Sequence, residues 1–211
     1  MRIACLHTAA SNIDLFESAR ADLGWPDQRL QHHVRPDLLS AAEAAGGLTA
    51  EISAETDRVL SELRCRFPVV LLTCSTLGPV INGKDQAILR ADAALADAVV
   101  RGGGRVSVLC AAPTTLKATG DLFSQAALAT GARIDLRVID GAWDLFKAGR
   151  FEAYAQTIAH AADQALAGGA DRVALAQASM TRAIDKVRGS PKPFTSPAAG
   201  LAAAGRLAGL I

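Results

Sequence analysis

The sequence is poor in aromatic residues and has almost no net charge. Only 4% of its 211 residues are aromatic, and 22 Lys and Arg stand against 21 Asp and Glu, which gives a formal net charge of +1. Proteins that bind nucleic acids use excess positive charge and aromatic side chains that stack on bases. The composition therefore disfavours a nucleic-acid partner. It favours a small, nearly neutral protein that handles a ligand.

Long apolar runs and paired cysteines are also missing. No apolar run approaches the roughly 20 residues that a membrane helix needs, and the run that ends at His7 is too short for a secretion signal. We therefore expect a cytoplasmic protein that does not associate with membranes. The cysteines Cys5, Cys65, Cys74 and Cys110 show no C-x-x-C spacing. We expect free thiols, no disulfide framework, no metal site and no cofactor.

Short apolar segments alternate with longer, alanine-rich amphipathic ones. The short segments have the length of buried strands, and glycines such as Gly24 and Gly131 follow the longer ones, as is typical of helix ends. This alternation indicates an α/β fold with parallel sheets covered on both faces. We expect strands at 2–7, 29–34, 68–73, 105–110, 133–139 and 172–177, and helices at 11–23, 37–45, 49–64, 84–101, 116–130, 143–148, 151–167 and 197–210.

The second half of the chain repeats the order of the first. A shift of 103 residues, from Arg2 to Arg105, carries 2–6 (RIACL) onto 105–109 (RVSVL) and 68–76 onto 171–179, while a shift of 104 aligns 30–34 with 134–138. Chance is the alternative, because any α/β protein shows some such matches. Glycines 102–104 separate the halves. We expect two pseudo-symmetric, Rossmann-like three-layer lobes, formed by residues 1–101 with 186–211 and by residues 102–185.

Polar and small residues follow the predicted strands where a ligand would bind. Ligands of open α/β sheets lie beyond the carboxyl ends of the strands. If the two lobes face each other across a pseudo-twofold axis, these ends line a cleft that would be the active site. The residues in question are His7, Thr8, Ser11 and Asn12, their counterparts Cys110, Ala111, Thr114 and Thr115, then Cys74, Ser75 and Thr76, and their counterparts Gln177, Ala178 and Ser179.

Cys74 ends an apolar strand and precedes two small hydroxyl residues, Ser75 and Thr76. Backbone N–H groups at the start of a following turn or helix would stabilise a thiolate and hold an anion. Such a cysteine serves as a base or a nucleophile, and the two hydroxyls could bind a carboxylate. A buried, inert thiol is the alternative. His7 is a second candidate base, because imidazole titrates near neutrality, although a hydrogen-bonded strand histidine explains it equally well.

Three short motifs resemble those of the aspartate/glutamate racemase superfamily. Residues 73–76 (TCST) are similar to its first cysteine motif, Cys-Asn-Thr, and residues 109–116 (LCAAPTTL) resemble the segment that opens its second half. Residues 175–180 (LAQASM) resemble its second cysteine motif, roughly Leu-Gly-Cys-x-x-Met. The resemblance spans essentially the whole chain. It implies cofactor-independent chemistry at a carbon next to a carboxylate or carbonyl, as in amino-acid and hydantoin racemases, maleate isomerases and arylmalonate decarboxylases.

The resemblance also implies a role for individual positions. Family racemases use two opposed cysteines as bases, and this sequence has Cys74 at the first position and Gln177 at the second. A glutamine amide only donates and accepts hydrogen bonds, so ordinary two-base racemisation is disfavoured. One-sided proton chemistry, isomerisation and decarboxylation stay open. The expected carboxylate or carbonyl holders are His7, Ser11, Asn12, Ser75, Thr76, Thr114, Thr115 and Ser179.

The favoured interpretation is an enzyme, either racemase-like or isomerase-like or a carbon–carbon lyase, in which Cys74 is the acid/base or nucleophile. The alternative is a non-catalytic protein that binds a small carboxylate on the same fold, which the missing second base favours. His32 and His33 alternate on a predicted strand and are expected to have no ligand role. A homodimer or a higher homo-oligomer is expected by analogy with family members.

Overall fold

The computed structural model describes residues 1–81, 83 and 85–210. The chain divides into unit 1, which is residues 1–94 with the C-terminal segment from Pro197, and unit 2, which is residues 95–196. The division falls inside helix α4 (Ala91–Val100) and not at the glycine run 102–104. The Arg172 guanidinium in unit 2 donates hydrogen bonds to the carbonyls of Val99 (3.1 Å) and Gly103 (2.8 Å), which ties the end of α4 to unit 2.

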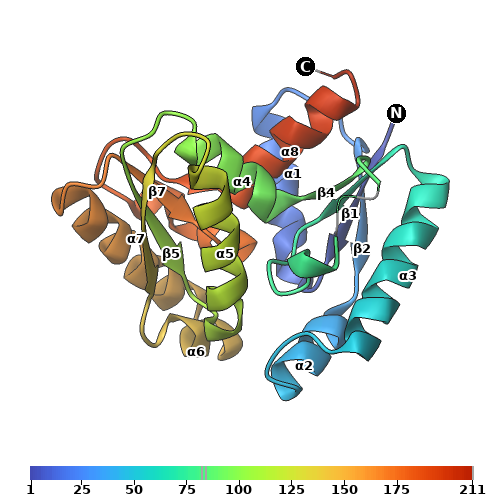
Figure 1. Cartoon of the computed structure of the whole chain (residues 1–211), viewed down its shortest axis with the longest axis horizontal. Coiled ribbons are helices and arrows are strands. Elements are labelled where there is room, and N and C mark those ends of the chain that lie inside the picture. The colour runs from blue at the N-terminus through green and yellow to red at the C-terminus, as the bar shows by residue number, and fades with distance from the viewer. Residues whose placement is uncertain (82, 84, 211) are drawn as a thin grey trace. The chain divides into compact units, whose positions relative to one another are not determined.

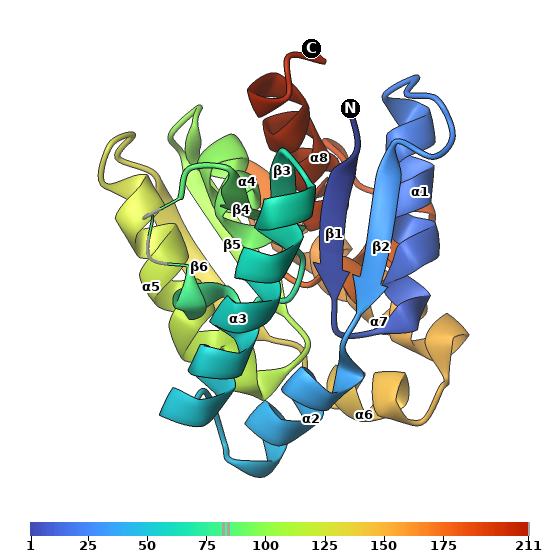
Figure 2. The same cartoon turned by 90° about the vertical axis from the view of Figure 1, so that its right-hand side faces the viewer.

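Unit 1 is built on a parallel sheet with the strand order β2-β1-β3-β4. The central strands β1 and β3 are buried along their whole length, as expected for strands covered on both faces. Figure 2 shows β1 and β2 side by side, with α1 next to them. The strands are β1 (Ile3–His7), β2 (Leu30–Val34), β3 (Val69–Leu72) and β4 (Ile88–Arg90), and the helices are α1 (Ile13–Asp22), α2 (Pro36–Ala44), α3 (Ala50–Arg66), the start of α4 and α8 (Ser196–Leu207), with short 3-10 turns η1 (Ala10–Asn12) and η2 (Gly78–Val80).

Local signals set the ends of these helices. The Thr49 side chain accepts a hydrogen bond from the Ile52 N–H and so caps the start of α3. At the end of α1, Gly24 takes a left-handed conformation (φ +69°), its N–H donates to the Ala21 carbonyl, and the next N–H donates to the Arg20 carbonyl. This pair of bonds closes the helix and turns the chain back toward β2.

Unit 2 repeats the same plan, with the strand order β6-β5-β7-β8 and all strands parallel. Its core packs the apolar face of α7, including Ala155 and Ile158, against Val173 and Leu175 of the central strand β7, and α5 lies on the other side of the sheet (Figure 1). The strands are β5 (Arg105–Cys110), β6 (Arg133–Val138), β7 (Arg172–Leu175) and β8 (Phe194–Thr195), and the helices are α5 (Leu116–Ala127), α6 (Ala142–Lys147) and α7 (Phe151–Ala167), with 3-10 turns η3 (Pro113–Thr115) and η4 (Ala178–Lys186).

The strand registers reproduce the shifts seen in the sequence. Ile3 pairs with Val69, and their counterparts 103 residues later, Val106 and Arg172, pair in the same way. Ile3 also pairs with Leu30, as Val106 does with residue 134, which is the shift of 104. The two units are therefore copies of one βαβ arrangement, and the predicted α/β fold with parallel sheets is confirmed.

Two short strands, β4 and β8, were not predicted from the sequence. The predicted helix 84–101 begins only at Ala91, because residues 88–90 form β4 at the edge of the sheet, and Lys84 lies outside the described residues. Strand β8, residues 194–195, was not predicted either. Strands of two or three residues have no apolar periodicity for a sequence pattern to reveal. Across the described part of the chain, no helix is both long and apolar enough to cross a membrane.

Candidate active site

The strand order of unit 1 marks where a ligand would bind. The chain leaves β1 for β2 on one side and reaches β3 on the other, so the sheet has its topological switch point between β1 and β3. Ligands of open α/β sheets bind at such points, beyond the carboxyl ends of the two strands. Thr8 follows β1 and Cys74 follows β3, and the two side chains are hydrogen-bonded to each other. The predicted cysteine thus lies at the switch point.

Cys74 is partly exposed and surrounded by hydrogen-bond donors. Burial raises the pKa of the thiol above its ordinary value. Hydrogen bonds from the Thr8 hydroxyl and from the backbone N–H groups of Leu77 and Thr76 act in the opposite direction, and the carboxylate of Asp92 raises the pKa again. The resting group is therefore a thiol at neutral pH, with three donors placed to stabilise negative charge when the proton leaves.

His7 lies on β1 and is fully buried. Its Nδ1 is 2.9 Å from Thr73 Oγ1, and its Nε2 is 2.9 Å from His32 Nδ1. The chain of polar contacts continues from His32 Nε2 to Glu17 Oε1 (3.0 Å) and from Glu17 Oε2 to Arg20 Nε (2.5 Å). Burial lowers the pKa of His7 to about 3, with a further contribution from the neighbouring histidines. Both nitrogens of His7 are thus occupied inside unit 1.

Burial raises the pKa of Glu17, but hydrogen bonds from His32 and Arg20 outweigh this and hold the pKa below its ordinary value. Arg20 is itself buried and also pairs with Asp27 (2.7 Å). Glu17 is therefore an ionised carboxylate at neutral pH. It anchors the polar chain that runs from α1 to β1.

The remaining predicted residues of unit 1 lie on the two loops beyond β1 and β3. Ser11 and Asn12 are in η1, and Ser75 and Thr76 follow Cys74. Asn12, Ser75 and Thr76 are buried. Asn12 Oδ1 has no hydrogen-bond partner among the described residues. A role for these side chains in binding a carboxylate stays a prediction.

Gln177 takes the corresponding place in unit 2, at the β5/β7 switch point. Its Oε1 accepts a hydrogen bond from the Ala111 N–H (2.6 Å), and its Nε2 donates to Thr115 Oγ1 (2.8 Å). The Cys110 thiol also hydrogen-bonds with the Gln177 side chain; burial raises the pKa of that thiol, and the hydrogen bond opposes the rise. Ala111 and Gln177 are the counterparts of Thr8 and Cys74 at the shift of 103, so the two units keep the same pair of positions in contact.

Two further site residues predicted from the sequence, Thr114 and Ser179, also lie in unit 2. Thr114 lies in η3, and its buried Oγ1 has no partner among the described residues. Ser179 is buried in η4, where its hydroxyl lies 2.8 Å from the Tyr154 hydroxyl. Tyr154 is fully buried, and burial raises the pKa of its phenol. The sequence patterns gave no signal for Tyr154, because it lies mid-helix and far from every motif.

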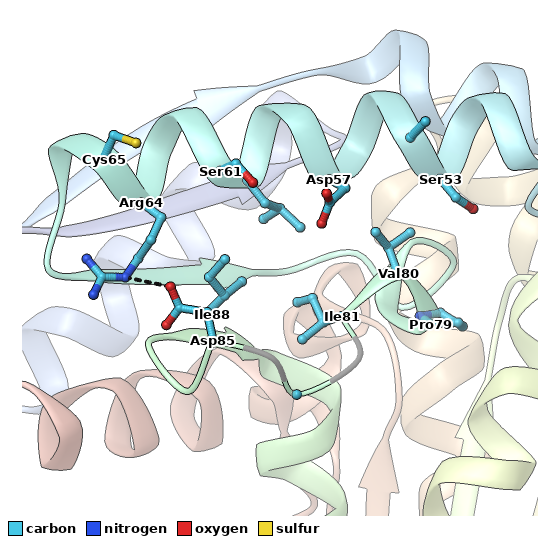
Figure 3. Close-up of a pocket in the computed structure, with 13 residues that line it drawn as sticks. Ser53, Asp57, Ser61, Arg64, Cys65, Pro79, Val80, Ile81, Asp85 and Ile88 are labelled. Carbon is cyan, nitrogen blue, oxygen red and sulfur yellow. Dashed lines mark ion pairs between the residues drawn. The ribbon is translucent and has the colours of Figure 1, made fainter.

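Unit 1 also has a surface groove of about 720 Å³ between α3 and the segment around η2. Figure 3 shows its walls, with Asp57 and Ser61 of α3 on one side, Val80 and Ile81 on the other, and the Arg64–Asp85 ion pair at one end. None of the sequence-predicted site residues lines it.

Cys5, His7 and His32 place their ligand atoms within 4.8 Å of one another. This group was missed because Cys5 and His7 come from β1 and His32 comes from β2, so no short spacing in the sequence joins them. The alternation of Cys5 and His7 on one strand can be seen in the sequence, but their pairing with His32 depends on the strand register.

No protein-family model and no curated protein sequence matches the chain. Solved structures do match it over essentially its whole length. The Picrophilus torridus aspartate racemase superposes with a TM-score of 0.74 at 14% identity, covering 99% of this chain and 95% of that one. The allantoin racemase from Klebsiella pneumoniae gives 0.69 at 13% identity, covering 100% and 88%. The maleate isomerase from Pseudomonas putida S16, solved with maleate, gives 0.57 at 16% identity, covering 99% and 92%.

These similarities define the fold. The chain is a two-lobed α/β protein that shares the fold of these racemase and isomerase structures. The identities, 13% to 16%, are too low for the matches to carry residue roles or substrates across.

Proposed function

We propose that the chain is a cofactor-independent enzyme of the racemase and isomerase type, acting at the carbon next to the carboxylate or carbonyl of a small acid. The observation that carries this proposal is the environment of Cys74: a thiol at the β1/β3 switch point that receives hydrogen bonds from Thr8 and from the N–H groups of Thr76 and Leu77. The racemase and isomerase names of the similar folds support the same reaction class.

In this mechanism Cys74 exchanges a proton with the substrate α-carbon. The three donors stabilise the thiolate that forms when Cys74 gives up its proton, and they lower the cost of separating charge in a partly buried place. Ser75, Thr76 and the free Oδ1 of Asn12 are the proposed polar contacts of the substrate on the same two loops.

Gln177 is proposed as a positioning group in unit 2. Its amide holds the Ala111 N–H and the Thr115 hydroxyl, and an amide does not exchange protons at neutral pH. We therefore propose one-sided chemistry, in which a single thiol serves the reacting carbon. Thr114, Thr115 and Ser179 are proposed as further polar contacts.

The test is solvent deuterium exchange at the α-carbon, followed by NMR for a panel of amino acids, hydantoins, hydroxy acids and substituted malonates. Product chirality and carbon dioxide release are followed in parallel. Cys74→Ser should lower the exchange rate by at least about 100-fold, the lower range for loss of a general acid/base. Cys65→Ser, a control at an exposed cysteine, should leave the rate unchanged.

Exchange that survives Cys74→Ser would refute the mechanism. Binding of a panel member with no exchange or turnover would instead establish a carboxylate-binding protein. A second variant, Gln177→Cys, puts a thiol at the position that the resemblance assigns to the second base. It should raise racemisation relative to one-sided exchange.

A further inference from the structure

A buried cluster on the sheet of unit 1 has the composition of a metal site. In β1, Cys5 and His7 are two residues apart and so point to the same face of the sheet. In the parallel register Cys5 pairs with His32 of β2. The three side chains therefore meet on one face, and their ligand atoms lie within 4.8 Å of one another. Alternation sends His33 to the other face, where its ring packs on Phe67.

The polar contacts around the cluster are compatible with one tautomer of each histidine that suits a metal site. When the Thr73 hydroxyl donates its one hydrogen to the Leu6 carbonyl (3.0 Å), it accepts a hydrogen bond from His7 Nδ1–H (2.9 Å). The Glu17 carboxylate only accepts, so His32 Nε2–H donates to it. If both rings are neutral, the remaining nitrogens, His7 Nε2 and His32 Nδ1, face each other with lone pairs at 2.9 Å.

In this tautomeric state the two facing lone pairs need a cation between them. A proton would serve, and so would a metal ion. Two features favour the metal ion. A third donor, the Cys5 thiol, converges on the same point, and each histidine gives its other N–H to a polar acceptor, Thr73 or Glu17, as metal-binding histidines do.

We infer that Cys5, His7 and His32 form a three-coordinate site for a thiophilic metal ion, and that Cu⁺ is the ion it fits. Thiolate and imidazole ligands select Cu⁺ and Zn²⁺ among the common ions. Cys5 and His7 are fully buried, and no fourth His, Cys, Asp or Glu among the described residues joins the cluster. Structural Zn²⁺ takes four ligands. Cu⁺ with one thiolate and two neutral imidazoles is uncharged, which suits a buried place, whereas Zn²⁺ would leave a net positive charge.

The spacing of the two histidine nitrogens needs a small adjustment. With metal–nitrogen bonds of about 2.0 Å in a trigonal plane, the two nitrogens would be about 3.5 Å apart. The rings therefore have to separate by roughly half an ångström from their 2.9 Å contact. The His32 side chain is 15% exposed, so the ion would enter from that side. The bound ion would link β1 to β2. It would take no part in the chemistry proposed for Cys74.

The test is an anaerobic titration of Cu⁺ into the whole protein, in a Cys65→Ser background that removes the exposed thiol. A colorimetric Cu⁺ chelator competes for the ion, and X-ray absorption reports the ligands. We expect one Cu⁺ per chain with one sulfur and two nitrogen ligands. Cys5→Ser and His32→Gln should each weaken binding more than about 100-fold, beyond the usual range for residues that only orient ligands. Cys110→Ser, a buried thiol outside the cluster, should bind as before.

A second variant keeps the test valid if a ligand substitution prevents folding. Glu17→Gln leaves all three ligands in place and should weaken Cu⁺ binding about 10- to 100-fold. Cu⁺ should also raise the melting temperature of the Cys65→Ser protein and not that of its Cys5→Ser derivative. The proposed site is refuted if stoichiometric Cu⁺ binding survives Cys5→Ser. It is also refuted if the unaltered site fails to take Cu⁺ from the chelator. Preference for Zn²⁺ in the same competition overturns the choice of Cu⁺.

Discussion

At the scale of single residues, the thiol of Cys74 is governed by a balance between burial and hydrogen bonding. Burial favours the neutral thiol, and the donors favour the thiolate. The net effect is a raised pKa, so the thiolate fraction grows only as the pH rises past the ordinary cysteine value of about 8.5. Reaction steps that need the thiolate should therefore speed up with alkaline pH.

This balance predicts the effect of Thr8→Val. The variant removes a donor to the thiolate, so the pKa of Cys74 should rise further and alkylation by iodoacetamide should shift to higher pH. The measurement is the alkylation rate against pH in the Cys65→Ser background, where the buried Cys5 and Cys110 react slowly. A midpoint that stays in place or moves to lower pH would show that the Thr8 hydroxyl does not stabilise the thiolate.

Sequence reasoning placed Cys74 directly beyond a strand, because position relative to a strand end is readable from a pattern. The contact between His7 and His32 was not readable, since it depends on the register of two strands 25 residues apart. The isolated histidine at the end of β1 looked like a candidate base. In the structure its two nitrogens serve Thr73 and His32.

At the scale of elements, the Gln177 side chain links the end of β7 to the turn that follows β5 through hydrogen bonds. Replacing it with leucine would leave the Ala111 N–H and the Thr115 hydroxyl without their buried partner. Each buried group that loses its partner costs about 1–3 kcal/mol. Gln177→Leu should therefore lower the free energy of unfolding by about 2–4 kcal/mol in urea denaturation. Gln156→Leu on the exposed side of α7 is the control and should change it by less than about 0.5 kcal/mol. If both variants lower the free energy of unfolding equally, the hydrogen bonds of the Gln177 amide do not stabilise the turn.

Gly200 lets α8 approach the start of α4. A Cβ at this position would lie 2.9 Å from the Ala91 Cβ and 3.1 Å from its Cα. In an unconstrained helix, Gly→Ala stabilises by up to about 1 kcal/mol. Here overpacking, at roughly 1–3 kcal/mol, should reverse the sign. Gly200→Ala should lower the urea midpoint, and the Ala91→Gly substitution should recover part of the loss in the double variant. A rise in the midpoint of the single variant would contradict the close packing.

Most elements could be predicted because long helices and fully buried strands leave clear periods in the sequence. Strands β4 and β8 could not, because two or three residues at a sheet edge show no period. The boundary between the units could not be predicted from the glycine run either. The division falls inside α4, and Arg172 ties the end of that helix to unit 2 by donating a hydrogen bond to the Val99 carbonyl.

At the scale of the whole molecule, the fold is one βαβ plan used twice. Each copy closes its own four-stranded sheet, and the strand pairs hydrogen-bond within a unit. A sheet whose hydrogen bonds are internal to one unit can open without breaking those of the other. Duplication therefore predicts two units of local stability.

Hydrogen–deuterium exchange followed by mass spectrometry of peptides tests this prediction with Gln177→Leu. The variant should speed exchange in peptides from β5, β6 and β7, by about 30-fold if the loss is 2 kcal/mol. Peptides from β1, β2 and β3 should exchange as they do in the unaltered protein, because none of their ladder hydrogen bonds involves unit 2. Gly200→Ala is the reciprocal variant and should act on unit 1 alone. If either variant accelerates exchange equally in both sheets, the chain opens as a single cooperative unit, and units 1 and 2 do not unfold independently.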